Sequence, residues 1–174
     1  MEIKTDRLVI RTFTADDLSE FRKLLDIPEV GGWQMQKNRA KDFLDWHLSN
    51  YEKMDITHGI VCLGIFDKAT GAILGNVGAG EHDDLHEPEI FYALLPKARG
   101  KGYAQEAARA VTEWALQRFD LPYIIATAAV DNIASQKVLE HCGYELVDER
   151  NLKIHILDRR EDFRYYRRYP DRQD

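Results

Sequence analysis

The sequence predicts a single domain of mixed α/β architecture, built on a sheet of about seven strands. Segments with the pattern of a strand are interleaved along the chain with segments whose apolar residues recur at helical spacing. Residues 89–130 read as strand, long helix and strand, the order of a crossover whose two strands are parallel. No repeat, low-complexity tract or linker divides the 174 residues, so we expect one domain over residues 1–174.

One strand and two helices are expected in the first third of the chain. Residues 7–12 alternate between polar and apolar side chains, as a half-buried strand does. Thr14 followed by Asp17 is a helix-start signal, a hydroxyl with an acid three residues later, and Pro28 ends this first helix. Apolar side chains at helical spacing predict a second helix at about 40–53.

The middle of the chain predicts a hairpin and a further strand. Residues 31–33, Gly-Gly-Trp, are expected to link the two early helices as a flexible segment. Residues 60–66 are β-branched and aromatic, which favours a buried strand. The turn residues of 67–71 then close a hairpin with 72–77, and 89–94 form the next strand.

The last part of the chain alternates between helices and strands. A long helix is expected over 102–119, a strand over 123–130 and a short helix over 134–142. Two more strands are expected within 144–169, around a turn at 158–162.

The charge balance bears on possible partners. The chain has 24 Lys plus Arg and 30 Asp plus Glu, a formal net charge of −6, and 44% of its residues are hydrophobic. This is the profile of a soluble globular protein without the broad basic field that brings proteins to nucleic acid or anionic lipid. We therefore expect no direct nucleic-acid or membrane partner, although a local basic site can still hold an anion.

Cysteine usage and the absence of apolar segments indicate a cytoplasmic protein. Cys62 and Cys142 are far apart and form no CxxC motif, which excludes a disulfide scaffold. The first residues contain no apolar signal segment, and the longest apolar run, 59–66, is too short to span a membrane.

A basic glycine loop between a strand and a helix is the most informative stretch. It reads Arg99-Gly100-Lys101-Gly102-Tyr103-Ala104, and the unpaired amides at the start of the following helix form an anion site. The Walker A string does not occur, and the third glycine of the Rossmann fingerprint is missing. The loop alone is also compatible with a glycine-rich helix cap that binds no ligand.

Four segments together resemble the GCN5-related N-acetyltransferases, the GNAT superfamily. Arg99-x-x-Gly102-x-Ala104 resembles the loop that binds the pyrophosphate of acetyl-coenzyme A in that superfamily. Three more segments resemble the branch that acetylates the N-termini of ribosomal proteins: residues 6–11, residues 89–92 and the stretch from Asn132 to Tyr144. The resemblance covers nearly the whole chain and implies the GNAT fold, a mostly antiparallel twisted sheet flanked by helices.

The resemblance implies acetyl-coenzyme A as co-substrate and a direct transfer of acetyl to an amine. The pantetheine arm is expected to pair with the strand 91–94 and a backbone N–H near Leu94 to polarise the thioester oxygen. Asn132 is expected to contact this arm or to cap the helix that follows, or both. The expected cofactor-binding residues are Leu94, Leu95, Arg99, Gly100, Lys101, Gly102, Tyr103, Ala104, Asn132 and Ser135.

A base is expected because the attacking amine must be neutral. Glu89 is the first candidate, acting directly or through water, and a purely structural hydrogen bond is the alternative for this residue. Glu81 is the second candidate, followed by His82 and His86.

Ser135 is the candidate that faces the leaving thiolate. Many GNAT relatives have a tyrosine seven residues after the asparagine, and this position is Leu139 here. The resemblance implies that Ser135 reaches the sulfur instead, with a hydrogen bond as its role and helix capping as the alternative.

Two other signals are set aside. The acidic and histidine-containing stretch 82–87 has no second ligand cluster, so no metal site is expected. Residues 159–174 mix six arginines with aromatic and acidic residues, which suits a final strand with one polar face better than an RNA site.

The expected function is that of an N-acetyltransferase acting on a primary amine, with a protein or peptide N-terminus as acceptor. A small-molecule amine such as a polyamine or an amino sugar is one alternative, and a non-catalytic acyl-CoA-binding protein is the other. Both a monomer and a homodimer are compatible with the sequence.

Overall fold

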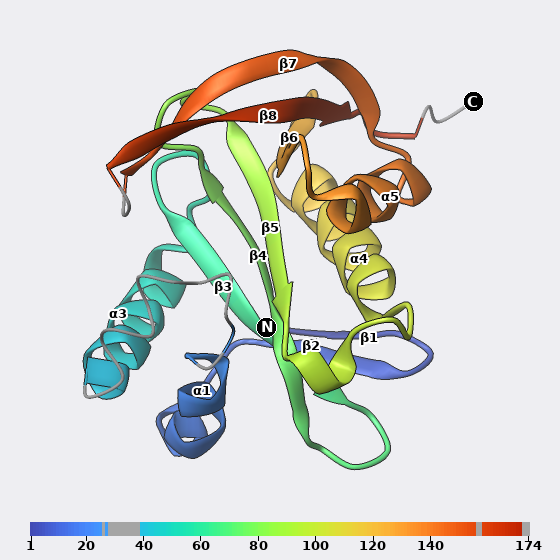
Figure 1. Cartoon of the computed structure of the whole chain (residues 1–174). Helices are drawn as coiled ribbons and strands as arrows, with labels where there is room; N and C mark the ends of the chain where they lie inside the picture. The colour runs from blue at the N-terminus through green and yellow to red at the C-terminus, as the bar shows by residue number, and fades with distance from the viewer. Residues whose placement is uncertain (26, 28–38, 156–157, 172–174) are drawn as a thin grey trace.

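The computed structural model describes residues 1–25, 27, 39–155 and 158–171, which form one open sheet with helices on both faces (Figure 1). Its eight strands lie in the order β1-β2-β3-β4-β5-β6-β8-β7. Their bounds are β1 Glu2–Lys4, β2 Leu8–Arg11, β3 Ile60–Asp67, β4 Ile73–Glu81, β5 Pro88–Leu94, β6 Ile124–Ala129, β7 Glu145–Ile154 and β8 Arg159–Arg168. The α-helices described are α1 Leu18–Leu24, α3 Ala40–Lys53, α4 Tyr103–Arg118 and α5 Ile133–His141.

The predicted mixed, mostly antiparallel sheet is confirmed, with three differences of detail. Strand β1 is an eighth strand, and its three residues are too few to show a pattern in the sequence. Strand β4 continues to Glu81, beyond the predicted 72–77. The turn predicted at 158–162 lies earlier in the chain, because β8 already begins at Arg159 and pairs there with Ile154. The predicted link at 31–33 lies outside the described residues.

The predicted capping residues hold a short 3-10 helix, Ala15–Asp17, that leads directly into α1. The Asp17 carboxylate accepts hydrogen bonds from the backbone N–H and the hydroxyl of Thr14, at 2.7 and 2.9 Å. It also binds the Arg11 guanidinium through both oxygens, at 2.7 and 2.8 Å. This pair joins the end of β2 to the helical segment and lowers the pKa of Asp17.

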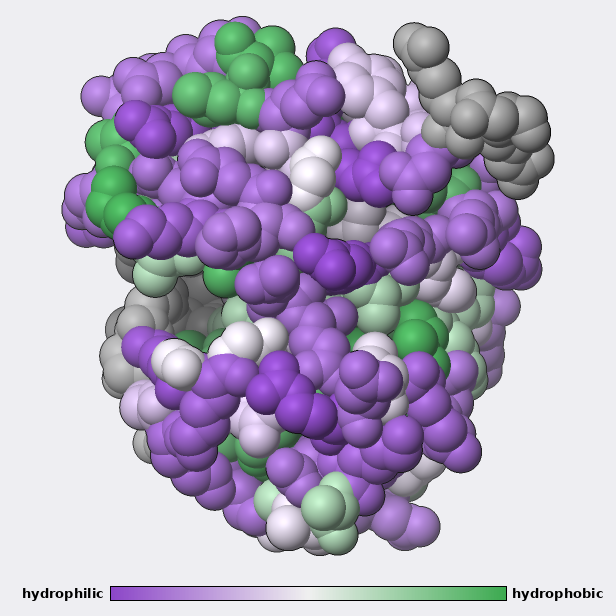
Figure 2. Space-filling view, turned by 90° about the vertical axis from the view of Figure 1, so that its right-hand side faces the viewer, coloured by the Kyte–Doolittle hydropathy of each residue, from purple (hydrophilic) through white to green (hydrophobic). Residues whose placement is uncertain are grey.

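Two apolar cores lie on opposite faces of the sheet. Helix α4 packs Val111 and Ala115 against one face, and α1 and α3 pack Phe21 and Leu44 against the other. The α4 and α5 side of the molecule is mostly hydrophilic, with hydrophobic residues only in small separate groups (Figure 2). Because side chains alternate along a strand, β5 contributes to both cores. Its even-numbered residues face α4, and Phe91 and Ala93 face α1 and α3.

The junction between β5 and β6 positions the site. These two strands are parallel, and in the described chain they pair only at Glu89 and Ile125. On its other side β5 pairs with β4 from Pro88 to Leu94, and β6 pairs with β8 along its whole length. The two strands therefore diverge towards their carboxyl ends, where the loop before α4 and the start of α5 lie. A gap of this kind leaves one backbone edge of β5 without a strand partner.

Candidate functional site

A cleft of about 330 Å³ opens where β5 and β6 diverge. Strand β5, the loop before α4 and the first turns of α4 and α5 form its walls. Its size falls in the range of small-molecule sites. The lining residues include Tyr92, Leu94, Arg99, Gly100, Asn132 and Ser135, which brings together the predicted glycine loop, the predicted strand and the predicted late helix.

The backbone of β5 presents hydrogen-bonding groups to this cleft. The N–H of Leu95 donates to the carbonyl of Leu74 in β4, at 2.9 Å. Backbone groups on a strand alternate in direction, so the N–H and C=O groups of Tyr92 and Leu94 point the opposite way, towards the gap. The expected backbone N–H near Leu94 is thus oriented into the cleft. Leu95 is different, because its N–H is already bonded and its side chain is buried.

The glycine loop has the backbone conformation that its sequence requires. Gly100 and Gly102 have φ values of +73° and +80°, which side chains other than glycine rarely tolerate. In the part of the chain that the structure describes, and apart from the two residues next to Gly100, no atom lies within 4 Å of the position that a Cβ on Gly100 would occupy, so the backbone there is open to a ligand. Helix α4 starts at Tyr103, and the N–H of Glu106 donates to the carbonyl of Gly102. The backbone N–H groups that precede Glu106 in the first turn have no acceptor within the helix.

An ion pair between Arg7 and Glu106 supports this loop on the side away from the cleft. The Glu106 carboxylate accepts from the Arg7 backbone N–H at 2.9 Å and from Arg7 Nε at 2.7 Å, and Thr5 Oγ1 donates to it. Arg7 Nη1 also donates to the carbonyl of Lys101, at 2.8 Å. Burial raises the pKa of Glu106, but the hydrogen bonds from Thr5 and Arg7 outweigh it and leave the pKa below its ordinary value. Two segments about a hundred residues apart in the chain therefore set the shape of the loop.

Arg99 makes a contact that its sequence context did not predict. Its Nε and Nη2 atoms both donate to the carbonyl of Leu94, at 3.1 Å each. The guanidinium therefore holds the end of β5 and occupies the Leu94 carbonyl, one of the two β5 carbonyls that point into the gap. The contact of Arg99 and Lys101 with a pyrophosphate stays a prediction.

Two hydroxyl groups meet on the wall of the cleft. Tyr92 Oη lies 2.8 Å from Ser135 Oγ, and burial raises the pKa of Tyr92 to about 12. The side chain of Asn132 accepts from the N–H of Ser135 at 3.1 Å. Asn132 therefore caps α5, which was one of its two predicted roles. Leu139 is buried in the core and brings no polar group to the cleft.

Sequence reasoning assigned no role to Tyr92, although two signals for it were present. It lies two residues before Leu94, so both side chains are expected on the same face of the strand. It also belongs to the segment that carries the family resemblance. Its partner lies 43 positions away, however, and no pattern in a single sequence reports that distance.

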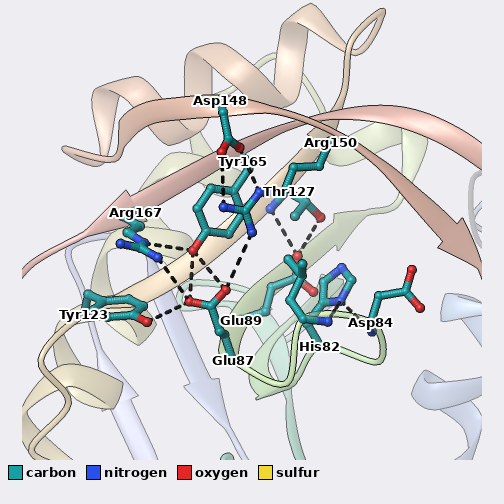
Figure 3. A network of polar contacts seen from close by, with 11 residues as sticks. His82, Asp84, Glu87, Glu89, Tyr123, Thr127, Asp148, Arg150, Tyr165 and Arg167 are labelled. Atoms are coloured by element: carbon teal, nitrogen blue, oxygen red, sulfur yellow. Dashed lines mark hydrogen bonds and ion pairs between the residues drawn. The ribbon is translucent and has the colours of Figure 1, made fainter.

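Glu89 lies on the other face of the same strand, at the single point where β5 and β6 pair. Its Oε1 accepts from the backbone N–H of Thr127 at 3.1 Å and from the Thr127 hydroxyl at 2.6 Å (Figure 3). Burial raises the pKa of Glu89, while His82 and the Thr127 bonds act in the opposite direction. A carboxylate with a raised pKa is a stronger base than an exposed one.

The other candidate bases are engaged in local contacts. Glu81 pairs with His86, at 3.0 Å. His82 Nδ1 accepts from the backbone N–H groups of Asp84 and Leu85, at 3.1 and 3.3 Å.

The matching family model decides the family. It is described as "Acetyltransferase (GNAT) domain" and matches residues 7–145. The chain belongs to the GNAT acetyltransferase family.

Relatives and solved structures agree with this assignment. This GNAT protein is 28% identical over 151 residues to the uncharacterized N-acetyltransferase YnaD of Bacillus subtilis, over 82% of each chain. Its fold is similar to that of a ribosomal-protein-S5-alanine acetyltransferase from Vibrio fischeri, with a TM-score of 0.80, 17% identity, and 98% and 97% of the two chains covered. It is also similar to the ribosomal L7/L12 α-N-protein acetyltransferase RimL, solved in complex with coenzyme A, with a TM-score of 0.81, 15% identity, and 98% and 99% covered.

A second polar network lies beside Glu89 in this GNAT protein. The Glu87 carboxylate accepts from the hydroxyls of Tyr123 and Tyr165, at 2.7 and 2.9 Å (Figure 3). Arg167 Nε donates to Tyr165 Oη at 2.8 Å, and Arg150 stacks 3.5 Å from the centre of the Tyr165 ring. The network joins the loop before β5 to the residue that precedes β6 and to strands β7 and β8. The aromatic and basic residues of β8 thus have partners within the protein.

The described residues contain neither a membrane-spanning helix nor a group of metal ligands. None of the helices described is long and apolar enough to cross a membrane. No group of three or more His, Cys, Asp or Glu residues in the described ranges is arranged to hold a metal ion.

We predict that Glu106→Gln destabilises the protein by about 1 kcal/mol at pH 7, because it removes a charged partner of Arg7. A carboxylate whose pKa is lowered by folding stabilises the fold above its unfolded pKa, and this contribution is lost as pH falls through the folded pKa. The difference from wild type should therefore shrink below about pH 4.5. Urea unfolding between pH 7 and pH 3.5 measures it.

Glu113→Gln is the matched control, since Glu113 is an exposed residue of the same helix. An equal effect of the two substitutions, or a difference for Glu106→Gln that does not depend on pH, would contradict the assigned role of this ion pair.

Proposed function

We propose that this GNAT protein transfers an acetyl group from acetyl-CoA directly to a primary amine, with the N-terminus of a protein or peptide as acceptor. The observation that supports this most is the unpaired edge of β5 beside the start of α4. An amide-containing arm can bind the Tyr92 and Leu94 backbone as an added strand. A pyrophosphate at the end of that arm can bind the N–H groups at the start of α4.

The cleft fits acetyl-CoA in its chemistry as well as in its size. Gly100 leaves its backbone accessible, and the capped start of α5 faces the loop across the cleft. The coenzyme A complex of RimL, which has a similar fold, supports the same donor. We assign the pyrophosphate to the backbone of residues 99–104, with Arg99 and Lys101 adding positive charge, and the thioester oxygen to a backbone N–H of Tyr92 or Leu94.

Glu89 is the proposed base. Three residues along a strand span about 10 Å, so the Glu89 carboxylate reaches an amine beside Tyr92 through intervening water. The free energy needed to neutralise the attacking amine depends on the acceptor. Neutralising a lysine side chain at pH 7 costs roughly 4.6 kcal/mol, and neutralising an N-terminal amine costs about 1–1.4 kcal/mol. A base that acts through water is therefore better matched to an N-terminal amine.

Free-thiol release from acetyl-CoA tests the proposal. We expect release with peptides that have a free α-amine and none with the same peptides after N-terminal acetylation. Release only with polyamines or amino sugars would assign a small-molecule acceptor instead. Acetyl-CoA binding without release for any acceptor would identify a non-catalytic acyl-CoA-binding protein.

The donor site is tested by Gly100→Asp, with Gly100→Asn as its control. Both side chains are alike in size and both tolerate positive φ, but only Asp adds a negative charge beside the pyrophosphate. We expect Asp to weaken acetyl-CoA binding at least about tenfold more than Asn does, equivalent to about 1.4 kcal/mol. Calorimetry measures both affinities, and equal values would show that the pyrophosphate does not bind at this loop.

Glu89→Gln is expected to lower kcat about a hundredfold and to leave acetyl-CoA affinity unchanged. Glu89 acts as a base only when ionised, and burial raises its pKa, so the ratio of wild-type to variant rate should fall as pH decreases through that pKa. Glu81→Gln is the control and should keep near wild-type kcat. A ratio that is constant with pH would leave Glu89 with a structural role only.

A further inference from the structure

The contact between Tyr92 and Ser135 joins the two walls of the cleft. Tyr92 comes from β5, and Ser135 comes from the first turn of α5. Their side-chain oxygens are 2.8 Å apart, and Tyr92 Oη is 3.2 Å from the backbone carbonyl of Ser135. Of the described residues that line the cleft, these two are the ones with side-chain hydroxyls. The pair is therefore the source of hydroxyl hydrogen bonds to a ligand bound there.

Either hydroxyl can donate the hydrogen bond between Tyr92 and Ser135. Tyr92 has one hydrogen, which can go to Ser135 Oγ at 2.8 Å or to the Ser135 carbonyl at 3.2 Å. Within α5 that carbonyl also accepts the N–H of Leu139, four residues on. When Ser135 donates its own hydrogen to an acceptor in the cleft, Tyr92 Oη is therefore the donor to Ser135 Oγ.

Donation in this direction leaves the hydrogen of Ser135 free to turn into the cleft. The backbone of Ser135 is itself held, because its N–H donates to Asn132 Oδ1 at 3.1 Å. Serine hydroxyls rotate easily, and an acceptor already occupied by Tyr92 restricts that rotation. Ser135 is thus fixed through its backbone by Asn132 and through its side chain by Tyr92.

We propose that Tyr92 is a positioning residue for Ser135, turning the Ser135 O–H towards the sulfur that leaves during acetyl transfer. This inference rests on the proposed function. When the amine nitrogen bonds to the acetyl carbon, the carbon–sulfur bond breaks and its electron pair stays on the sulfur. The Ser135 O–H donates a hydrogen bond to that thiolate, and the proton of the amine leaves through Glu89.

Ser135 keeps its own proton in this step. A thiol has a pKa of about 8.5, and a serine hydroxyl is a far weaker acid, so the thiolate takes its proton from solvent. The contribution of Ser135 is the stabilisation of developing charge by a hydrogen bond in a fixed orientation. Orientation is what Tyr92 supplies, since its own oxygen is engaged with Ser135.

Tyr92→Phe tests the inference, because it removes Oη and keeps the ring. We expect kcat to fall about tenfold, as in Ser135→Ala, with acetyl-CoA affinity and KM within about twofold of wild type. The double variant should be no slower than the slower single variant, since both remove the same hydrogen bond.

Tyr144→Phe is the matched control. Tyr144 Oη lies 2.8 Å from the Thr112 hydroxyl, so it is also a buried tyrosine paired with a hydroxyl, but it lies outside the residues that line the cleft. We expect its kcat to equal that of wild type. A similar loss of kcat in Tyr144→Phe would assign the Tyr92 effect to packing.

Three results would overturn the role of Tyr92: unchanged kcat in Tyr92→Phe, multiplicative losses in the double variant, or a loss confined to KM. These outcomes differ from failure of the proposed function, in which wild-type protein releases no thiol with any acceptor. Calorimetry with acetyl-CoA keeps the test valid, because normal affinity in Tyr92→Phe shows that the cleft is intact.

Discussion

The single point of pairing between β5 and β6 is the constraint on which the rest of the site depends. Glu89 and Ile125 are opposite each other at this point, and the strands separate beyond it. Two polar contacts hold the closed end, one between Glu89 and Thr127 and one between Glu87 and two tyrosines, Tyr123 just before β6 and Tyr165 in β8. With this end closed, divergence at the other end follows from the pairing of each strand with its outer neighbour, and the cleft is the space that results.

The alternation of side chains along β5 distributes chemistry between the two faces of the sheet. Glu89 and Phe91 lie on the face of α1 and α3, whereas Tyr92 and Leu94 lie on the face of α4 and α5. The formal net charge of −6 is likewise divided, because basic residues cluster in the loop 99–101 and acidic ones in 81–89. One strand therefore presents a carboxylate on one face, a hydroxyl on the other, and backbone donors along its open edge.

Local features of the fold and site could be predicted from the sequence, and long-range pairings could not. The α3 helix and the crossover show periodicities that extend over many residues, and the glycine loop has a composition that only particular backbone conformations explain. Strand β1 is too short for such a signal. The contacts of Glu87 with Tyr165 and of Arg7 with Glu106 join segments 78 and 99 positions apart, so their partners follow from tertiary packing. For Arg99, likewise, the sequence indicates a positive charge in the loop but does not indicate that the guanidinium binds the carbonyl of Leu94.

The division of β5 into two faces also bears on how such a site can change its acceptor. In the proposed reaction, the donor binds backbone groups of β5 and the start of α4, which are insensitive to most side-chain substitutions. The proposed base Glu89 is instead a side chain on the other face of β5, beside the network around Glu87, which reaches β7 and β8 through Arg150 and Tyr165. Substitutions on this second face can alter the acceptor while the backbone edge of β5 is kept. Under the proposed function, the acceptor is therefore the less constrained of the two substrates, because the backbone of the fold maintains the cleft assigned to the donor.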